Sequence, residues 1–199
     1  MAMEFFPLPT GLPVPVDDGA AAHLAGRALP DIALASTDGS AVKLAQLRGR
    51  WVIYVYPRTG QPGVALPEGW DAIPGARGCT PQSCGFRDHF AELAALGAGV
   101  FGLSSQTSEY QREVRDRLHL PFELLSDSTL QLAADPGLPS FTVAGMHLFK
   151  RLTLIVDNGR ISKLFYPVFP PDLNAAEVVR WLGDHATGVE GGVDPARQV

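Results

Sequence analysis

Continuous apolar runs are the clearest pattern along the chain. Residues 51–56 and 100–104 form uninterrupted, largely apolar runs, which are typical of strands buried on both faces. Residues 151–156 and 161–166 flank the turn sequence Asp-Asn-Gly-Arg and predict a β-hairpin. Weaker strand patterns lie at 32–37, 42–44 and 122–125.

Helical periodicity fills the segments between these strands. Apolar positions recur at i, i+4 and i+7 from residue 86, which predicts a helix from Thr80 to the Gly97–Gly99 pair. The other helical patterns cover 109–118, 126–134 and 173–185. Because the elements follow the order β-α-β-α-β-β-α, we predict an α/β fold with a mixed sheet flanked by helices on both faces.

The chain is predicted to hold one domain with two extensions. Residues 1–28 are rich in Pro and Ala, which predicts an N-terminal arm. We expect the domain to cover residues 29–186 and residues 187–199 to form a flexible tail. Within the domain, residues 58–78 contain three prolines and five glycines, so neither a helix nor a strand is expected there. Loops this long are more often functional than decorative.

Composition narrows the class of protein. Apolar residues make up 46% of the 199, enough to bury a core without disulfides or a structural metal. The net charge of −5 argues against sequence-independent binding of nucleic acid. We expect no membrane span and no secretory signal, because no long apolar run or basic N-terminal region occurs. Two cysteines are too few for a secreted disulfide scaffold, so we expect a soluble cytoplasmic protein.

Both cysteines lie in the segment Gly78–Asp88, where the long loop meets the predicted helix. The free N–H groups and the positive end of a helix dipole favour a thiolate over a thiol at such a position. Arg77 would add to this effect if its side chain turned inward. Cys79 is therefore placed to be a reactive nucleophile.

The spacing of Cys79 and Cys84 limits how they can combine. Residues five apart on an ideal helix have Cα atoms roughly 8.6 Å apart, whereas a disulfide needs less than about 7 Å. If both residues are helical, the first turn must unwind before they can bond. The pair thus predicts a switch between a helix with two thiols and an unwound loop with one disulfide.

Simpler interpretations of the cysteines stay open. Buried free cysteines are common and inert. A zinc site is improbable, because Cys79, Cys84 and the nearby His89 point about 140° apart in succession on a helix and do not converge. We predict neither a metal nor a cofactor.

The segment Gly78–Asp88, Gly-Cys-Thr-Pro-Gln-Ser-Cys-Gly-Phe-Arg-Asp, resembles the active-site helix of the bacterioferritin-comigratory-protein (Q-type) peroxiredoxins. The similarity extends through Leu-Ser-Ser at 103–105, Leu-Leu-Ser-Asp at 124–127 and the strand at 151–157, and covers residues 29–185. It implies a thioredoxin-like fold and thiol-dependent reduction of hydrogen peroxide and organic hydroperoxides. A thioredoxin-like dithiol would be the reductant, and the protein would be a monomer or a dimer.

The resemblance also assigns roles to residues. Cys79 would be the peroxidatic cysteine and Cys84 the resolving cysteine, with an intramolecular disulfide between them. Arg151 would hold the thiolate and polarise the peroxide. The alternative for Arg151 is an ordinary strand-edge arginine beside Lys150.

One position departs from the family pattern, which has a hydroxyl three residues before the peroxidatic cysteine. Ala76 stands there, and the loop before it is longer than in the family. We expect Thr59, close behind Pro57 and the preceding strand, to return the hydroxyl to the substrate pocket. The alternatives are that Thr59 only caps a turn, or that the site works without this hydroxyl.

Two other functions remain open. A general disulfide oxidoreductase on the same fold would want a Cys-x-x-Cys motif, which is absent. A binding module that has lost turnover would use the loop at 58–78 as its contact surface.

Overall fold

The computed structural model describes residues 8–185. The predicted tail at 187–199 and the first seven residues of the predicted arm lie outside the described residues. None of the helices within 8–185 is long and apolar enough to cross a membrane.

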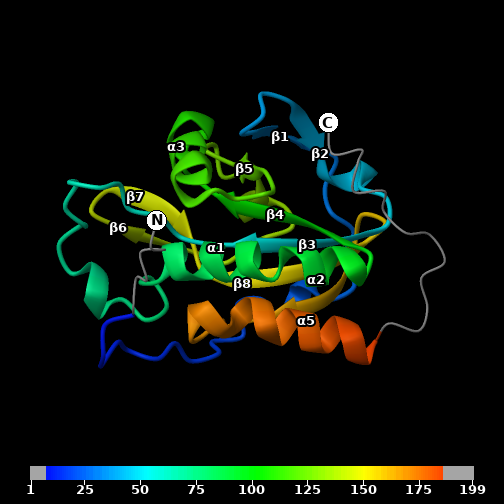
Figure 1. The fold of residues 1–199 in the computed structure, drawn as a ribbon. Helices are drawn as coiled ribbons and strands as arrows, with labels where there is room; N and C mark the ends of the chain where they lie inside the picture. Colours follow the sequence, from blue (N-terminus) through cyan, green and yellow to red (C-terminus); the bar gives the residue numbers. More distant parts are fainter. Residues whose placement is uncertain (1–7, 186–199) are drawn as a thin grey trace.

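A seven-stranded mixed sheet forms the centre of the molecule (Figure 1), in the order β2-β1-β5-β4-β3-β8-β9. β3 runs parallel to β4, and β4 runs parallel to β5, while the remaining neighbours are antiparallel. The strands are β1 (Ala33–Ser36), β2 (Ala41–Lys43), β3 (Arg50–Val55), β4 (Ala98–Ser104), β5 (Leu124–Ser126), β8 (Leu152–Asp157) and β9 (Arg160–Phe165).

The buried runs of the sequence are interior strands of this sheet, as predicted. Successive side chains of a strand point to opposite faces, and β3 accordingly supplies two separate cores. Trp51, Ile53 and Val55 pack on one face, while Val52 and Tyr54 pack on the other. The predicted hairpin at 151–166 is confirmed as β8–β9.

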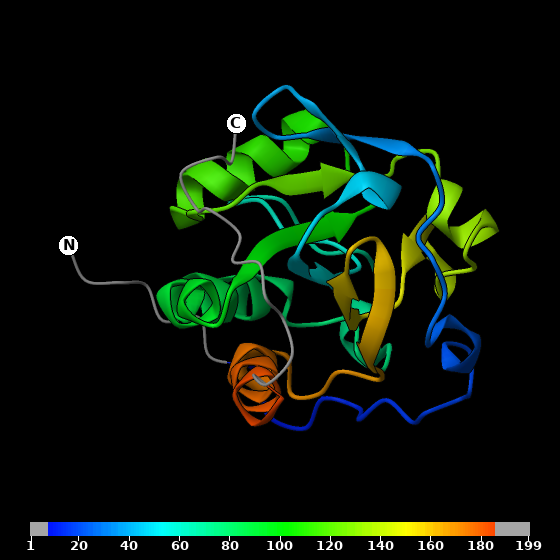
Figure 2. The same cartoon turned by 90° about the vertical axis from the view of Figure 1, so that its right-hand side faces the viewer.

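Helices cover the sheet on both sides. The α-helices are α1 (Cys79–Asp88), α2 (Phe90–Ala95), α3 (Ser108–Leu118), α4 (Gln131–Ala134) and α5 (Asn174–Asp184). Figure 2 shows α1, α3 and α5 on one side, and α4 with residues 21–29 on the other, in agreement with the two cores. The predicted α/β class is therefore confirmed.

The helix expected from Thr80 to Gly97 is interrupted. His89 separates α1 from α2, with backbone angles of φ −96° and ψ 8° that leave the helical region. Phe86 and Leu93 are nevertheless both fully buried in the same core. The apolar periodicity thus identified the buried face but not the break.

An additional hairpin, β6 (Ser140–Val143) and β7 (Met146–Phe149), was not predicted. It packs against the long loop at 58–78, which contains the short 3-10 helix η3 (Trp70–Ala72). Trp70 and Leu148 are buried between the two segments, which lie side by side in Figure 1. The loop and the hairpin therefore form a small third core.

The described part of the predicted arm runs along the surface and then enters the core. Ala21 and Leu24 are fully buried. Asp18 accepts hydrogen bonds from Lys150 Nζ at 2.5 Å and from Tyr166 Oη at 2.7 Å. These contacts, led by the bond from Lys150, hold the pKa of the Asp18 carboxyl well below its usual range.

Candidate active site

Cys79 is the first residue of α1, and a glycine lets the chain enter this helix. Gly78 has φ +100°, in the left-handed region that favours glycine. A Cβ atom at Gly78 would lie 2.3 Å from Cγ of Pro171 and 2.8 Å from Cδ2 of Leu8. The start of α1 is therefore packed closely against the segment that leads into α5, and Cys79 is only 3% exposed.

Arg151 directly precedes β8, and its side chain is buried against this helix start. Nη2 donates to Cys79 Sγ at 3.1 Å. The same guanidinium also donates to the main-chain oxygens of Gly75, Ala76 and Arg77, and to Gln82 Oε1. The structure thus brings together the two residues that the sequence assigned to one site.

The surroundings of Arg151 favour an anion at Cys79. Arg151 is 3% exposed, and within residues 8–185 its hydrogen-bond acceptors are neutral oxygens and the sulfur rather than a carboxylate. A buried guanidinium is costly unless an opposite charge compensates it. The Cys79 thiolate is the group in contact that can supply this charge.

The backbone of Ala76 also contacts the Cys79 sulfur. Its methyl group packs in the third core, where the residue is 1% exposed. Its carbonyl oxygen accepts from Arg151 Nη2 at 3.1 Å and lies 3.6 Å from Cys79 Sγ, from which it accepts a hydrogen bond only when the sulfur is protonated. At the sequence position of the family's hydroxyl this chain therefore has a buried methyl group, and the backbone carbonyl of the same residue holds the arginine.

Arg77 does not turn inward as the sequence analysis allowed. Its Nη1 pairs with Asp71 Oδ1 at 3.1 Å on the surface of the loop. Only its main-chain oxygen reaches the site, as an acceptor for Arg151 Nη2. The cation next to Cys79 is thus Arg151.

Cys84 lies five residues, or about 1.4 turns, further along α1. Both cysteines are helical and neither forms a disulfide, so the condition on which the spacing argument rests, that both residues are helical, is met. Cys84 is half-buried, and this burial raises the pKa of its thiol, with the nearby Arg87 acting in the opposite direction. Cys84 is therefore a thiol rather than a thiolate at neutral pH in this conformation.

A chain of buried amides that the sequence analysis missed supports Arg151. Gln82 Nε2 donates to Asn174 Oδ1 at 3.0 Å, and Thr153 Oγ1 donates to the same oxygen at 2.7 Å. Gln82, Asn174 and Thr153 are each at most 1% exposed. The only sequence signal was the position of Gln82, three residues after Cys79 and hence on the same side of the helix.

Thr59 and Pro57 are both buried at the end of β3. The hydroxyl of Thr59 donates to Gln106 Oε1 at 3.0 Å, and its main-chain oxygen accepts from Gln106 Nε2 and from Tyr110 Oη. These contacts tie Thr59 to Gln106 in the loop between β4 and α3 and to Tyr110 in α3. The pocket role expected for Thr59 stays a prediction.

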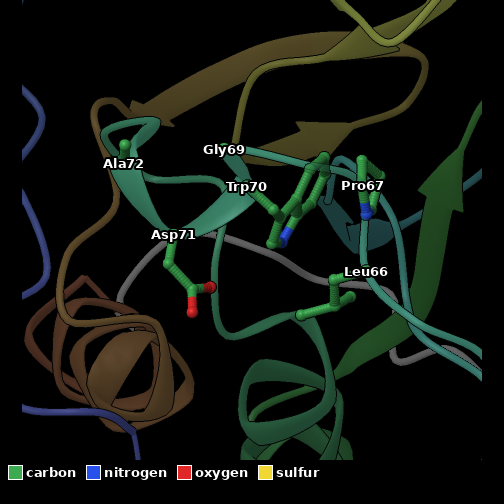
Figure 3. Close-up of a pocket in the computed structure, with 6 residues that line it drawn as sticks. All are labelled: Leu66, Pro67, Gly69, Trp70, Asp71 and Ala72. Carbon is green, nitrogen blue, oxygen red and sulfur yellow. The ribbon is translucent and has the colours of Figure 1, made fainter.

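The loop also carries a surface pocket (Figure 3), lined by Leu66, Pro67, Gly69, Trp70, Asp71 and Ala72. All six residues belong to the segment at 58–78, so the pocket is a feature of this loop alone. Among the residues that the structure describes, no group of three or more His, Cys, Asp or Glu side chains could hold a metal ion. His89 instead pairs with Glu92 at 2.9 Å.

The comparisons with known proteins all indicate the same family. The Redoxin family model matches residues 24–180. The chain is 31% identical to the peroxiredoxin Bcp of Escherichia coli K12 over 170 residues, which cover 81% of this chain and 97% of that protein. It is also 31% identical to the chloroplastic peroxiredoxin Q of Oryza sativa subsp. japonica, of which it spans 65%.

Solved structures of peroxiredoxins share the fold. The peroxidoxin BcpB of Mycobacterium tuberculosis superposes with a TM-score of 0.65 at 24% identity, over 80% of this chain and 96% of that one. A peroxiredoxin Q of Xanthomonas campestris gives 0.63 at 22% identity, over 79% and 96%. These similarities confirm the predicted thioredoxin-like fold.

Proposed function

Because this chain belongs to the Redoxin family and, within it, to the Bcp and Q-type peroxiredoxins, we propose that it is a thiol-dependent peroxidase. The observation that carries the proposal is the buried Arg151, which donates to Cys79 Sγ at 3.1 Å. A cation held in this way stabilises a thiolate, the form of cysteine that attacks peroxides.

The first step occurs at Cys79. Its thiolate attacks one oxygen of the hydroperoxide, so that an S–O bond forms and the O–O bond breaks. The sulfur loses two electrons to the peroxide and becomes a sulfenic acid, and the second oxygen leaves as an alcohol or water after taking up a proton. Arg151 stabilises the charge that develops on these oxygens.

The second step joins Cys79 and Cys84. The first turn of α1 unwinds, and the Cys84 thiolate attacks the sulfenic sulfur and displaces hydroxide. Unwinding also exposes Cys84, which removes the burial that raises the pKa of its thiol. The product is an intramolecular disulfide, which a thioredoxin-like dithiol reduces by exchange.

The substrates are hydrogen peroxide and organic hydroperoxides, as expected for the family. The compartment stays a prediction, because the relatives include chloroplast proteins as well as a bacterial protein. Thr59 and Pro57 remain the proposed pocket residues at the end of β3.

Mass spectrometry after one equivalent of hydrogen peroxide tests the proposal. The wild-type chain should lose two hydrogens as the disulfide forms, and the Cys84→Ser chain should instead carry a sulfenic acid that dimedone traps. The Cys79→Ser chain should consume no peroxide. A Cys79→Ser chain that reacts as fast as the wild type would refute the proposal.

A further inference from the structure

The donor-only chemistry of Arg151 fixes the orientation of two amides behind it. A guanidinium has no acceptor, so the side-chain oxygen of Gln82 must face Arg151 and its nitrogen must point away. That nitrogen needs an acceptor, which is Asn174 Oδ1 at 3.0 Å. If the amide of Asn174 were reversed, its Nδ2 would face Gln82 Nε2, and neither of these two donors could accept a hydrogen bond.

Asn174 is itself fixed by β8. Thr153 Oγ1 donates to Asn174 Oδ1 at 2.7 Å, and this oxygen therefore has two donors. The other end of the same amide, Nδ2, is buried without a hydrogen-bond partner among the described residues, which is costly in a protein interior. Among the described residues, the hydrogen bonds of the Asn174 side chain are therefore made by its oxygen and not by its nitrogen.

We propose that Asn174 is a positioning residue for the peroxidase site, acting through Gln82 on both Arg151 and the first turn of α1. This inference rests on the proposed function. Asn174 holds the amide of Gln82 so that its oxygen faces Arg151 and keeps the guanidinium against Cys79.

The same contacts oppose the unwinding of α1. Gln82 lies between Cys79 and Cys84, in the turn that must open for the disulfide to form. Its two side-chain bonds tie this turn to Arg151, which precedes β8, and to α5, and both must break during opening. Asn174 therefore favours attack on peroxide and slows resolution by Cys84.

Loss of Asn174 should change the two steps in opposite directions. A neutral hydrogen bond is worth about a 2- to 13-fold change in an equilibrium constant. In Asn174→Leu we expect sulfenic acid formation to be about tenfold slower and disulfide formation to be about tenfold faster. Rapid-quench mass spectrometry with hydrogen peroxide, with and without dimedone, measures both rate constants on the full chain.

A double-mutant cycle with Gln82→Leu separates positioning from general damage. If Asn174 acts through Gln82, the Asn174→Leu substitution should change neither rate by more than about twofold in the Gln82→Leu background. Val178→Ala is the matched control, because Val178 is a fully buried residue of α5 that packs in the core. It should lower stability without the opposite changes in rate.

Three results would overturn the inference: wild-type rates in Asn174→Leu, the same effect in the Gln82→Leu background, or the same pair of changes in Val178→Ala. If Asn174→Leu does not fold, Thr153→Val removes only one of the two donors to Asn174 Oδ1. It should change both rates about threefold in the same directions, and unchanged rates would equally overturn the inference. A wild-type chain that forms no sulfenic acid would instead refute the proposed function.

Discussion

Replacement of Arg151 is the most direct test of the electrostatics at Cys79. Arg151→Met keeps an unbranched apolar stem, although a shorter one, and removes the charge and all donors. Arg151→Lys keeps the charge but loses the planar arrangement of donors that now reaches several acceptors. The two variants together distinguish the charge from its placement.

The expected loss can be bounded from the geometry. Two unit charges at the observed separation of 3.1 Å attract by about 1 kcal/mol at the dielectric constant of water and by about 5 kcal/mol at an effective value of about 20. Removal of one preorganised donor from an enzyme's anion site costs about 10²- to 10³-fold in rate, which lies within these bounds. We expect Arg151→Met to slow sulfenic acid formation by about 10²- to 10³-fold and Arg151→Lys by about tenfold.

The assay combines two measurements. Rapid-quench mass spectrometry gives the rate constant with hydrogen peroxide, and alkylation by iodoacetamide in the Cys84→Ser background reports how much thiolate Cys79 carries. Thermal unfolding checks that the variants are folded. An Arg151→Met chain that reacts with peroxide within threefold of the wild type would refute the role of the guanidinium.

Three further predictions concern the chain around the site. Because Cys84 is a thiol in the helix, where burial raises its pKa, and must lose its proton to attack after unwinding, disulfide formation should accelerate by up to about tenfold per pH unit between pH 6 and 8; a rate independent of pH would contradict this. Gly78→Ala should lower the free energy of unfolding in urea by about 1–3 kcal/mol more than Gly97→Ala, because both glycines have positive φ but a Cβ meets neighbours only at Gly78. Thr59→Val should slow sulfenic acid formation about tenfold if the Thr59 hydroxyl serves the substrate pocket. An unchanged rate would mean that this hydroxyl only binds Gln106 and has no role in the reaction.

The sequence was most informative where a local pattern decides the structure. The run at 51–56 became an interior strand because its β-branched and aromatic side chains suit a site buried on both faces. The turn Asn158-Gly159 closes the β8–β9 hairpin at positive φ, as these two residue types favour. Arg151 needed the family resemblance, since no periodicity links it to a cysteine 72 residues earlier in the chain.

The hairpin β6–β7 escaped prediction for a physical reason. Its turn is Ala144-Gly145, with φ of 47° and 75°. Hairpin turns with two positive φ values favour Asn-Gly or Asp-Gly, because an alanine in the left-handed region is strained. The usual turn signal is therefore missing, and packing of Phe141 in β6 against Trp70 in the third core compensates for it.

Ala76 shows how a departure from a family pattern can have a structural meaning that the sequence hides. In the sequence alone, Ala76 shows only that the family's hydroxyl is missing at this position. In the structure its methyl group is buried with Trp70 and Leu148, while its carbonyl oxygen accepts from Arg151. A larger or polar side chain would disturb this packing, and with it the carbonyl that helps to hold the guanidinium. The long loop and the extra hairpin thus bear directly on the site, because their shared core ends at the residue that contacts both Arg151 and Cys79.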